Sequence, residues 1–216
     1  MRIIVIDNTQ KHLTAALQTL AGHDITICDT HDKALELLRS QKDNAIFKKL
    51  YAEYQAASIA NAYEKACQES ALPYWDAVLC DLLMPAGRNA QGEGMRLVGQ
   101  EMAVGWSLAL MAARNGAKFV AVVSDMNHHA HPASAMLDAI NHHIFDIDGT
   151  KMLMTNDVAR VGIIGTECAC KECAGSGKTG RGDGCWRCKE SGTDFTEKGK
   201  DWGKILEQLV GNTTAE

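Results

Sequence analysis

The sequence has no long hydrophobic run and no excess of positive charge. No apolar stretch approaches the ~20 residues that a membrane-spanning helix needs, so we expect no membrane association. The 216 residues carry a net charge of −5, which argues against a general nucleic-acid binder. The first apolar segment, residues 2–6, ends at Asp7 and is too short for a secretory signal. With no export signal, we expect a cytoplasmic protein.

The chain does contain enough hydrophobic material to form a core. Hydrophobic residues make up 46% of the sequence, and the length fits one ordinary domain with a small appendage. We predict an α/β domain over residues 1–160. A cysteine-rich, zinc-binding module with a C-terminal helix would then occupy residues 161–216.

Four cysteines near the C-terminus form two Cys-x-x-Cys pairs, Cys170 with Cys173 and Cys185 with Cys188. Five of the eleven residues between the pairs are glycine, which lets the chain reach positive φ angles and come close to a bound ion. A tetrahedral zinc ion binds four thiolates at about 2.3 Å, and two such turns joined by a pliable loop supply them. The spacing therefore predicts a structural zinc site.

Other roles for these cysteines are weaker. A redox-active pair normally follows a strand and opens a helix, whereas both pairs here lie in glycine-rich polar sequence. Disulfides would need an oxidising compartment, which nothing else in the sequence indicates. Cys168, two residues before the first pair, is either a bystander or a ligand that exchanges with Cys170.

Residues 168–192 resemble one zinc unit of the cysteine-rich region of DnaJ-type co-chaperones. Residues 170–177 have the full Cys-x-x-Cys-x-Gly-x-Gly pattern, and residues 185–192 keep the cysteines and the last glycine but have Glu190 where the first glycine would be. No J-domain precedes the unit, so the resemblance implies a scaffold and a protein-binding surface rather than co-chaperone activity. Several basic residues near the cysteines also leave nucleic acid open as a partner. They are Lys171, Lys178, Arg181, Arg187 and Lys189.

Short apolar runs alternate with helix-period segments over the first 155 residues. We expect strands over residues 2–6, 25–28, 76–80 and 118–123, and either 144–147 or 152–154 as a fifth. We expect helices over residues 11–20, 32–39, 94–115, 133–141 and 201–210. Residues 43–70 contain no Gly or Pro and predict a helical insertion. The pattern predicts an open, doubly wound, parallel five-stranded sheet of the flavodoxin or receiver type.

Polar side chains follow three of the predicted strands. Asp7 and Asn8 come after the first, Asp81 after the third, and Ser124 and Asp125 after the fourth. Because the carboxyl ends of parallel strands meet at one edge of the sheet, we expect these side chains to lie close together.

This ordered set resembles the receiver domain of bacterial response regulators, over roughly residues 1–155. Asp7 and Asn8 align with the acidic pair of that family, with Asn in the second place. Residues 81–85, Asp-Leu-Leu-Met-Pro, match its phospho-acceptor motif Asp-x-x-Met-Pro. Ser124 stands where the family has Ser or Thr.

The receiver resemblance implies a phosphorylation site. Asp81 would accept the phosphoryl group, and Asp7, Asn8 and Asp81 would hold Mg²⁺. Ser124 would contact the phosphoryl oxygens together with a lysine that closes the fifth strand, for which Lys151 is the candidate. We therefore expect a signalling or adaptor protein in which phosphorylation or ligand binding at Asp81 regulates partner binding through the zinc module.

A histidine-rich segment leaves a second function open. Five of the eight histidines lie within residues 128–143, and His128, His129 and His131 follow the fourth strand directly. Together with Asp7, Asp81 and Asp125, such histidines could bind a metal or act as acid–base groups in an α/β enzyme. The alternative is a polar loop whose histidines cap helices and pair with nearby acidic residues.

Overall fold

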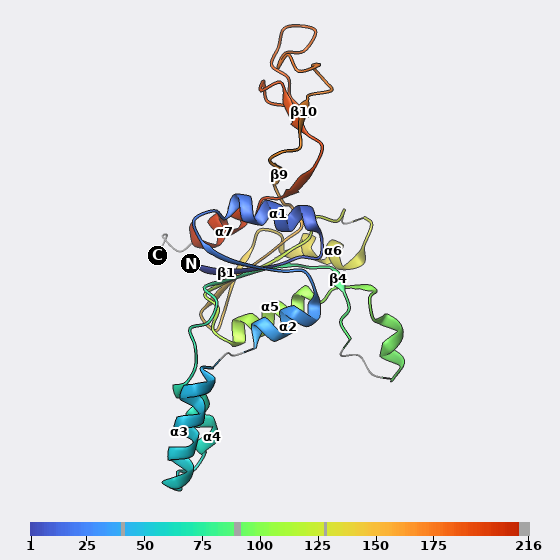
Figure 1. The fold of residues 1–216 in the computed structure, drawn as a ribbon. Coiled ribbons are helices and arrows are strands. Elements are labelled where there is room, and N and C mark those ends of the chain that lie inside the picture. Colours follow the sequence, from blue (N-terminus) through green and yellow to red (C-terminus); the bar gives the residue numbers. More distant parts are fainter. Residues whose placement is uncertain (40–41, 89–91, 128, 212–216) are drawn as a thin grey trace.

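The computed structural model describes residues 1–39, 42–88, 92–127 and 129–211. A six-stranded sheet with the order β2-β1-β3-β6-β8-β7 lies at its centre (Figure 1). The strands are β1 (Arg2–Ile6), β2 (Asp24–Cys28), β3 (Ala77–Asp81), β6 (Phe119–Val123), β7 (Ile144–Ile147) and β8 (Thr150–Thr155). The first five in the spatial order are parallel, and β7 pairs antiparallel with β8. Both candidates for the fifth strand are thus strands, and the sheet has one strand more than predicted.

The central strands are buried on both faces, which explains their continuous apolar sequence. Residues 3–6 of β1 and 120–123 of β6 have no exposed surface. Side chains alternate between the two faces, so Ile3 and Val5 enter one hydrophobic cluster while Ile4 and Ile6 enter another.

Helices cover both faces of the sheet (Figure 1). On one side lie α1 (Gln10–Thr19) and α7 (Trp202–Gly211), whose inward residues include Leu13 and Trp202. On the other lie α2 (His31–Leu38) and α5 (Gly105–Arg114), which contribute Leu38 and Leu108. The α/β class with a mostly parallel, doubly covered sheet is therefore as predicted.

The predicted long helix over residues 94–115 is wrong in its first half. Residues Gly92–Leu97 form a 3₁₀ turn, η1, and β5 (Glu101–Met102) then pairs with β4 (Met84–Pro85) before α5 begins. Gly99, with a φ of +79°, turns the chain between η1 and β5. The later predicted helix at 133–141 consists of α6 (Pro132–Met136) followed by a 3₁₀ turn, η2 (Leu137–Ile140).

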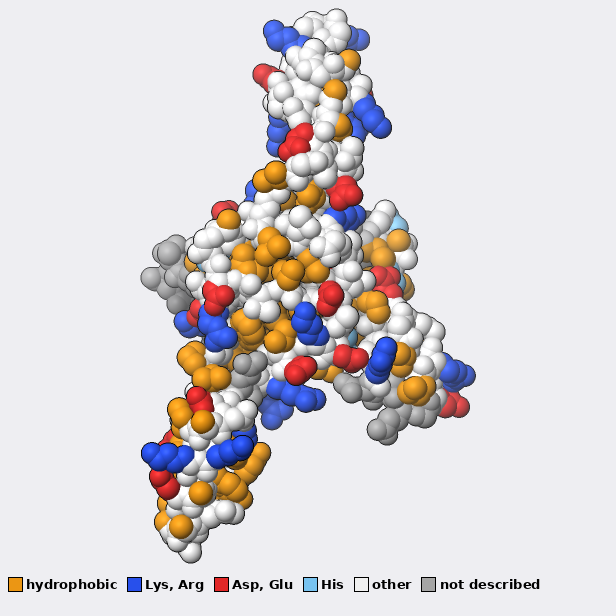
Figure 2. Space-filling model, in the orientation of Figure 1, with side chains coloured by type: hydrophobic (Ala, Val, Ile, Leu, Met, Phe, Trp, Pro, Cys, Tyr) orange, Lys and Arg blue, Asp and Glu red, His pale blue; other side chains and the backbone are white. Residues whose placement is uncertain are grey.

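The insertion at residues 43–70 is helical, as predicted. It forms a hairpin of α3 (Asn44–Ala56) and α4 (Ala62–Glu69) that projects from the sheet (Figure 1). The ends of the hairpin meet where the Asp43 N–H donates to the Ser70 carbonyl oxygen at 2.8 Å. Hydrophobic side chains remain on its outer surface (Figure 2), among them Ile46 and Tyr63.

The cysteine-rich segment forms an arm between β8 and α7. Two short ladders build it: β9 (Arg160–Gly162) with β12 (Lys198–Lys200), and β10 (Glu167–Ala169) with β11 (Thr193–Phe195). The arm extends away from the sheet, and α7 then returns to pack on it (Figure 1). The C-terminal helix, which we grouped with the cysteine-rich module, thus contributes to the core of the α/β domain.

None of the helices in the described ranges combines the length and the apolar character needed to cross a bilayer.

Candidate functional site

The carboxyl edge of the sheet brings together the acidic residues that follow three strands, and a buried lysine bridges them. The Lys200 ammonium donates to Asp7 Oδ2 at 2.7 Å and to Asp81 Oδ1 at 2.6 Å. Asp125 Oδ1 lies 3.7 Å from the same nitrogen. Lys200 is fully buried, so one ammonium group faces three carboxylates with little water between them.

Lys200 is the last residue of β12, and three contacts of the surrounding backbone fix it beside the carboxylates. Gly199 lets β12 lie directly on α1, because a Cβ atom there would stand 2.6 Å from the Lys11 carbonyl oxygen. The Lys200 backbone N–H donates to His12 Nδ1 at 3.1 Å. Trp202 Nε1 donates to the His12 carbonyl oxygen at 3.0 Å. His12 thus fixes the backbone on both sides of the turn into α7.

Lys151, which we expected at this site, lies elsewhere. Its register partner is Phe119, at the start of β6, so it occupies the amino end of the parallel strands rather than the carboxyl end. Its ammonium pairs with Asp146 at 3.1 Å. The cysteine-rich arm separates the last parallel strand from the last helix, and the lysine at the site comes from the end of that arm.

The excess of carboxylates shapes the ionisation of the cluster. Burial, with the neighbouring Asp7 and Asp125, raises the pKa of Asp81 to about 7, although Lys200 acts in the opposite direction. Burial disfavours the charged form of Lys200, but Asp81, Asp7 and Asp125 outweigh it and raise the pKa of the ammonium. Lys200 therefore stays charged at neutral pH, and the carboxyl group of Asp81 is the member poised to gain or lose a proton.

Asp125 is the most exposed carboxylate of the three and is held by cations. Its Oδ2 lies 3.2 Å from His12 Nε2 and accepts from Arg160 Nη2 at 3.1 Å. Because His12 Nδ1 accepts the Lys200 N–H, the Nε2 atom carries the hydrogen that faces Asp125. The His12 hydrogen bond, with Lys200 and Arg160, holds the pKa of Asp125 well below its usual range.

Ser124 follows β6 beside the cluster, as predicted. Its hydroxyl oxygen accepts from the Met126 N–H at 3.3 Å and lies 3.2 Å from the hydroxyl oxygen of Ser134 on α6. The side chain is almost fully buried, so these contacts hold it in one position.

A small cavity opens onto Asp81. It has a volume of about 190 Å³, and Asn8, Asp81, Ser124 and Asp125 are among the residues that line it. At about 30 Å³ per water molecule, this space equals about six waters. Asp81 Oδ2 has no hydrogen-bond partner among the described residues, and the side chain is 11% exposed. The site thus leaves one carboxylate oxygen accessible.

Of the described histidines in the 128–143 segment, His131, His142 and His143 serve local structure. His131 Nδ1 accepts from the Ala133 N–H and caps α6. His142 pairs with Asp157 at 3.1 Å, and the ring of His143 packs edge-on against Phe145. His128 lies outside the described residues. The histidine that lies in the acidic cluster is His12, which the sequence analysis did not single out.

The four cysteines Cys170, Cys173, Cys185 and Cys188 converge, with ligand atoms all within 4.8 Å of one another. The sulfurs of Cys170 and Cys185 are 3.8 Å apart, and those of Cys173 and Cys188 are 3.6 Å apart. Tetrahedral bonds of about 2.3 Å place two sulfurs about 3.8 Å apart, so the spacing fits. The cluster could hold a metal ion such as zinc. Within the described ranges no other cluster of three or more ligand residues comes together in this way.

The glycines of the two turns allow the close approach of their backbones. A Cβ atom at Gly177 would lie 2.3 Å from the Glu190 carbonyl oxygen, and one at Gly192 would lie 2.2 Å from the Gly175 carbonyl oxygen. Although burial opposes it, the N–H of Gly177, which donates to Cys173 Sγ at 3.3 Å, helps to lower the pKa of this thiol to about 7. Cys168 lies on β10, outside the cluster.

Comparison with known proteins gives no match for this chain, whether among protein families, curated sequences or solved structures. The function must therefore be argued from the two sites themselves.

Proposed function

We propose that this chain is a receiver-like signalling or adaptor protein in which phosphorylation or ligand binding at Asp81 regulates partner binding through a zinc-bearing arm. The observation that carries the proposal is the buried ammonium of Lys200, which contacts both Asp7 and Asp81. This lysine belongs to the end of the arm, so the acidic cluster and the arm share one residue.

The surroundings of Asp81 support the role of a phosphoryl acceptor. A free carboxylate oxygen would attack the phosphorus of an acyl phosphate, and the bond to the leaving carboxylate would break as that group takes the electron pair. The new acyl phosphate would carry additional negative charge, which Lys200 is placed to offset. The cavity provides the space, and the Ser124 hydroxyl lies on its wall.

Asp7, Asn8 and Asp81 would hold Mg²⁺ in this proposal. Carboxylate and amide oxygens are ligands that this ion accepts, and three carboxylates against the two cations Lys200 and Arg160 leave negative charge uncompensated. A divalent cation bound there would supply charge neutralisation for the incoming phosphoryl group.

Zinc is the metal we propose for the four-cysteine cluster. Four thiolates in tetrahedral arrangement are the ligand set of structural zinc sites. The arm would present a partner surface, which is supported by Trp186. Trp186 stands between Cys185 and Cys188 in the sequence, and it is 71% exposed. Large exposed aromatic residues are enriched at the centres of protein interfaces.

Incubation with acetyl phosphate and Mg²⁺, followed by intact mass measurement, tests the proposed acceptor. We expect a gain of about 80 Da, the mass of one phosphoryl group. The adduct should be absent from Asp81→Asn, and Asp138→Asn is a control because this exposed acidic residue lies outside the acidic cluster. An adduct of equal yield in Asp81→Asn would reject Asp81 as the acceptor.

A further inference from the structure

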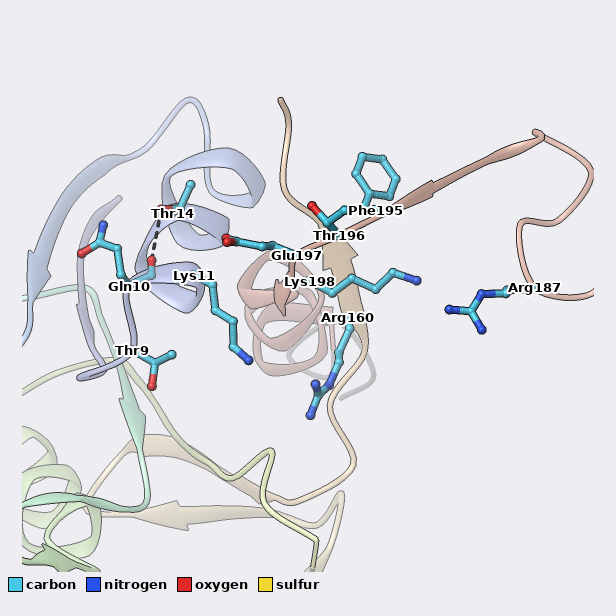
Figure 3. Close-up of a pocket in the computed structure, with 10 residues that line it drawn as sticks. All are labelled: Thr9, Gln10, Lys11, Thr14, Arg160, Arg187, Phe195, Thr196, Glu197 and Lys198. Atoms are coloured by element: carbon cyan, nitrogen blue, oxygen red, sulfur yellow. Dashed lines mark hydrogen bonds between the residues drawn. The ribbon is translucent and has the colours of Figure 1, made fainter. Parts of the chain in front are cut away.

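A second, larger cavity lies between α1 and the base of the arm (Figure 3). Its volume is about 740 Å³, within the range of small-molecule sites. Four cations line it against one acidic residue, Glu197. They are Lys11, Arg160, Arg187 and Lys198.

The strand register explains how the cations gather. Arg160 on β9 is opposite Lys200 on β12, and Lys198 lies two residues before Lys200. Residues two apart on a strand share a face, so this face carries three cations. Lys200 enters the acidic cluster, while Arg160 and Lys198 line the cavity.

The cations form two pairs. Lys11 and Arg160 extend toward the same space near the start of α1, whereas Lys198 and Arg187 approach each other at the arm (Figure 3). Glu197 points toward α1, away from the second pair (Figure 3).

Two carboxylates outside the cavity orient three of these cations. Asp194 accepts from Arg187 Nε at 2.7 Å and lies 2.6 Å from the Lys198 ammonium. Arg160 donates to Asp125 through Nη2, and its Nε and Nη1 groups have no acceptor among the described residues, so they remain as donors. Lys11 has no ion pair or hydrogen bond through its ammonium within the described part of the chain. Oriented cations with spare donors suit a multiply charged anion.

We propose that this cavity binds a small molecule that carries a polyphosphate chain. A single phosphate would reach one pair of cations, whereas linked phosphates would extend from the Lys11 end to the Arg187 end. The cavity is open to solvent, and its volume lies within the range of small-molecule sites. The inference does not depend on phosphorylation of Asp81, because none of the four cations contacts that residue.

Isothermal titration calorimetry of the zinc-loaded full chain with inorganic tripolyphosphate tests the proposal. We expect saturable binding that weakens as salt is raised, and orthophosphate should bind at least about tenfold more weakly because it engages fewer donors. Lys11→Glu should weaken tripolyphosphate binding by at least about tenfold. Its ammonium has no described partner, so the fold should tolerate this change.

The matched control is Lys204→Glu, which makes the same charge change at an exposed position of α7 outside the cavity. It should leave the affinity within about twofold, since distant charges are screened. Retention of zinc in every titration would show that tripolyphosphate acts as a ligand rather than as a chelator. Binding should also persist in Asp81→Asn, which separates this inference from the proposed phosphorylation.

Three results would overturn the proposal. One is the absence of measurable binding at millimolar tripolyphosphate, and another is equal affinity in wild type and Lys11→Glu. The third is tighter binding of a hexaglutamate peptide than of tripolyphosphate under the same salt conditions, which would assign the cavity to an acidic protein segment.

Discussion

The Lys200 ammonium group donates the hydrogen bonds that water would otherwise donate to the buried carboxylates of Asp7 and Asp81. A buried ion pair gains little over a hydrophobic pair, but removing one partner leaves the other charges uncompensated in a low dielectric. The same side chain also lies 5.4 Å from the ring centroid of Trp202. These contacts make Lys200 the residue on which the acidic cluster depends most.

Lys200→Met should therefore lower the free energy of unfolding by about 3–5 kcal/mol. Lys151→Met is the control, because the Lys151–Asp146 pair is partly exposed and should contribute less than about 1 kcal/mol. Urea denaturation at pH 7 measures both values. Equal effects of the two substitutions would contradict the structural role of Lys200.

The raised pKa of Asp81 predicts a pH dependence of stability in Mg²⁺-free buffer. The folded protein keeps this carboxyl group protonated up to about pH 7, whereas the unfolded chain releases the proton near pH 4. The folded state thus binds more protons across this window, so stability falls as pH rises from about 4 to about 7.

The difference in melting temperature between wild type and Asp81→Asn isolates this effect. We expect wild type to lose stability relative to the variant as pH rises through the window, because Asn does not titrate. A difference that stays constant from pH 4.5 to pH 8, a range spanning most of this window (about 4 to 7), would contradict the raised pKa.

Among the elements, β12 has little room for change. It packs against α1 through Gly199, where a Cβ atom would lie 2.5 Å from the Ala15 Cβ. Neither α1 nor β12 can move away from the other without displacing Lys200 from the acidic cluster of Asp7 and Asp81.

Gly199→Ala should destabilise the fold by about 1–3 kcal/mol through overpacking. The matched control is Gly180→Ala, since nothing lies within 4 Å of a Cβ atom at Gly180 and its φ is not in the left-handed region. Thermal unfolding of the two variants provides the measurement. Gly199→Ala should also reduce any acetyl phosphate adduct, because Lys200 follows it directly.

The arm is short of hydrophobic residues, and its one buried cluster consists of the four cysteines. We expect about one zinc per chain by elemental analysis, and chelation should unfold residues 168–192 while the sheet persists. Cys173→Ser should lose the metal, and Cys168→Ser should retain it because Cys168 lies outside the cluster. Loss of zinc from both variants would show that Cys168 takes part.

Elements with strong local patterns could be predicted from the sequence, and those decided by distant contacts could not. The buried strands follow from continuous apolar runs such as residues 119–123, and the cysteine cluster follows from its spacing. The start of α5 could not be predicted, because it depends on a distant contact at Gly105. A Cβ atom at Gly105 would lie 2.3 Å from the Asp81 carbonyl oxygen, so only glycine fits there. Lys200 was missed because the arm separates it from the last parallel strand.

At the scale of the whole molecule, the helical hairpin α3–α4 is attached rather than embedded. Its two helices mainly contact each other, and its ends meet at the Lys42–Ala71 bridge. The exposed hydrophobic side chains on the hairpin (Figure 2) can therefore contact another molecule without any change in the sheet.

Replacement of residues 44–69 by a short Gly-Ser linker should leave the sheet and the zinc content intact, with a change in melting temperature of no more than a few degrees. Circular dichroism and metal analysis measure the outcome. Failure of the shortened chain to fold would show that the hairpin stabilises the sheet.

The contact between Lys200 and Asp7 joins residues 193 positions apart. During synthesis the first strand and its aspartate leave the ribosome long before the lysine does, so the acidic side chains stay hydrated until β12 and α7 emerge. Docking of that helix and neutralisation of the buried charge then become one event. A nascent chain truncated before β12 would lack both, and its Asp7 and Asp81 side chains would have no buried cation to pair with.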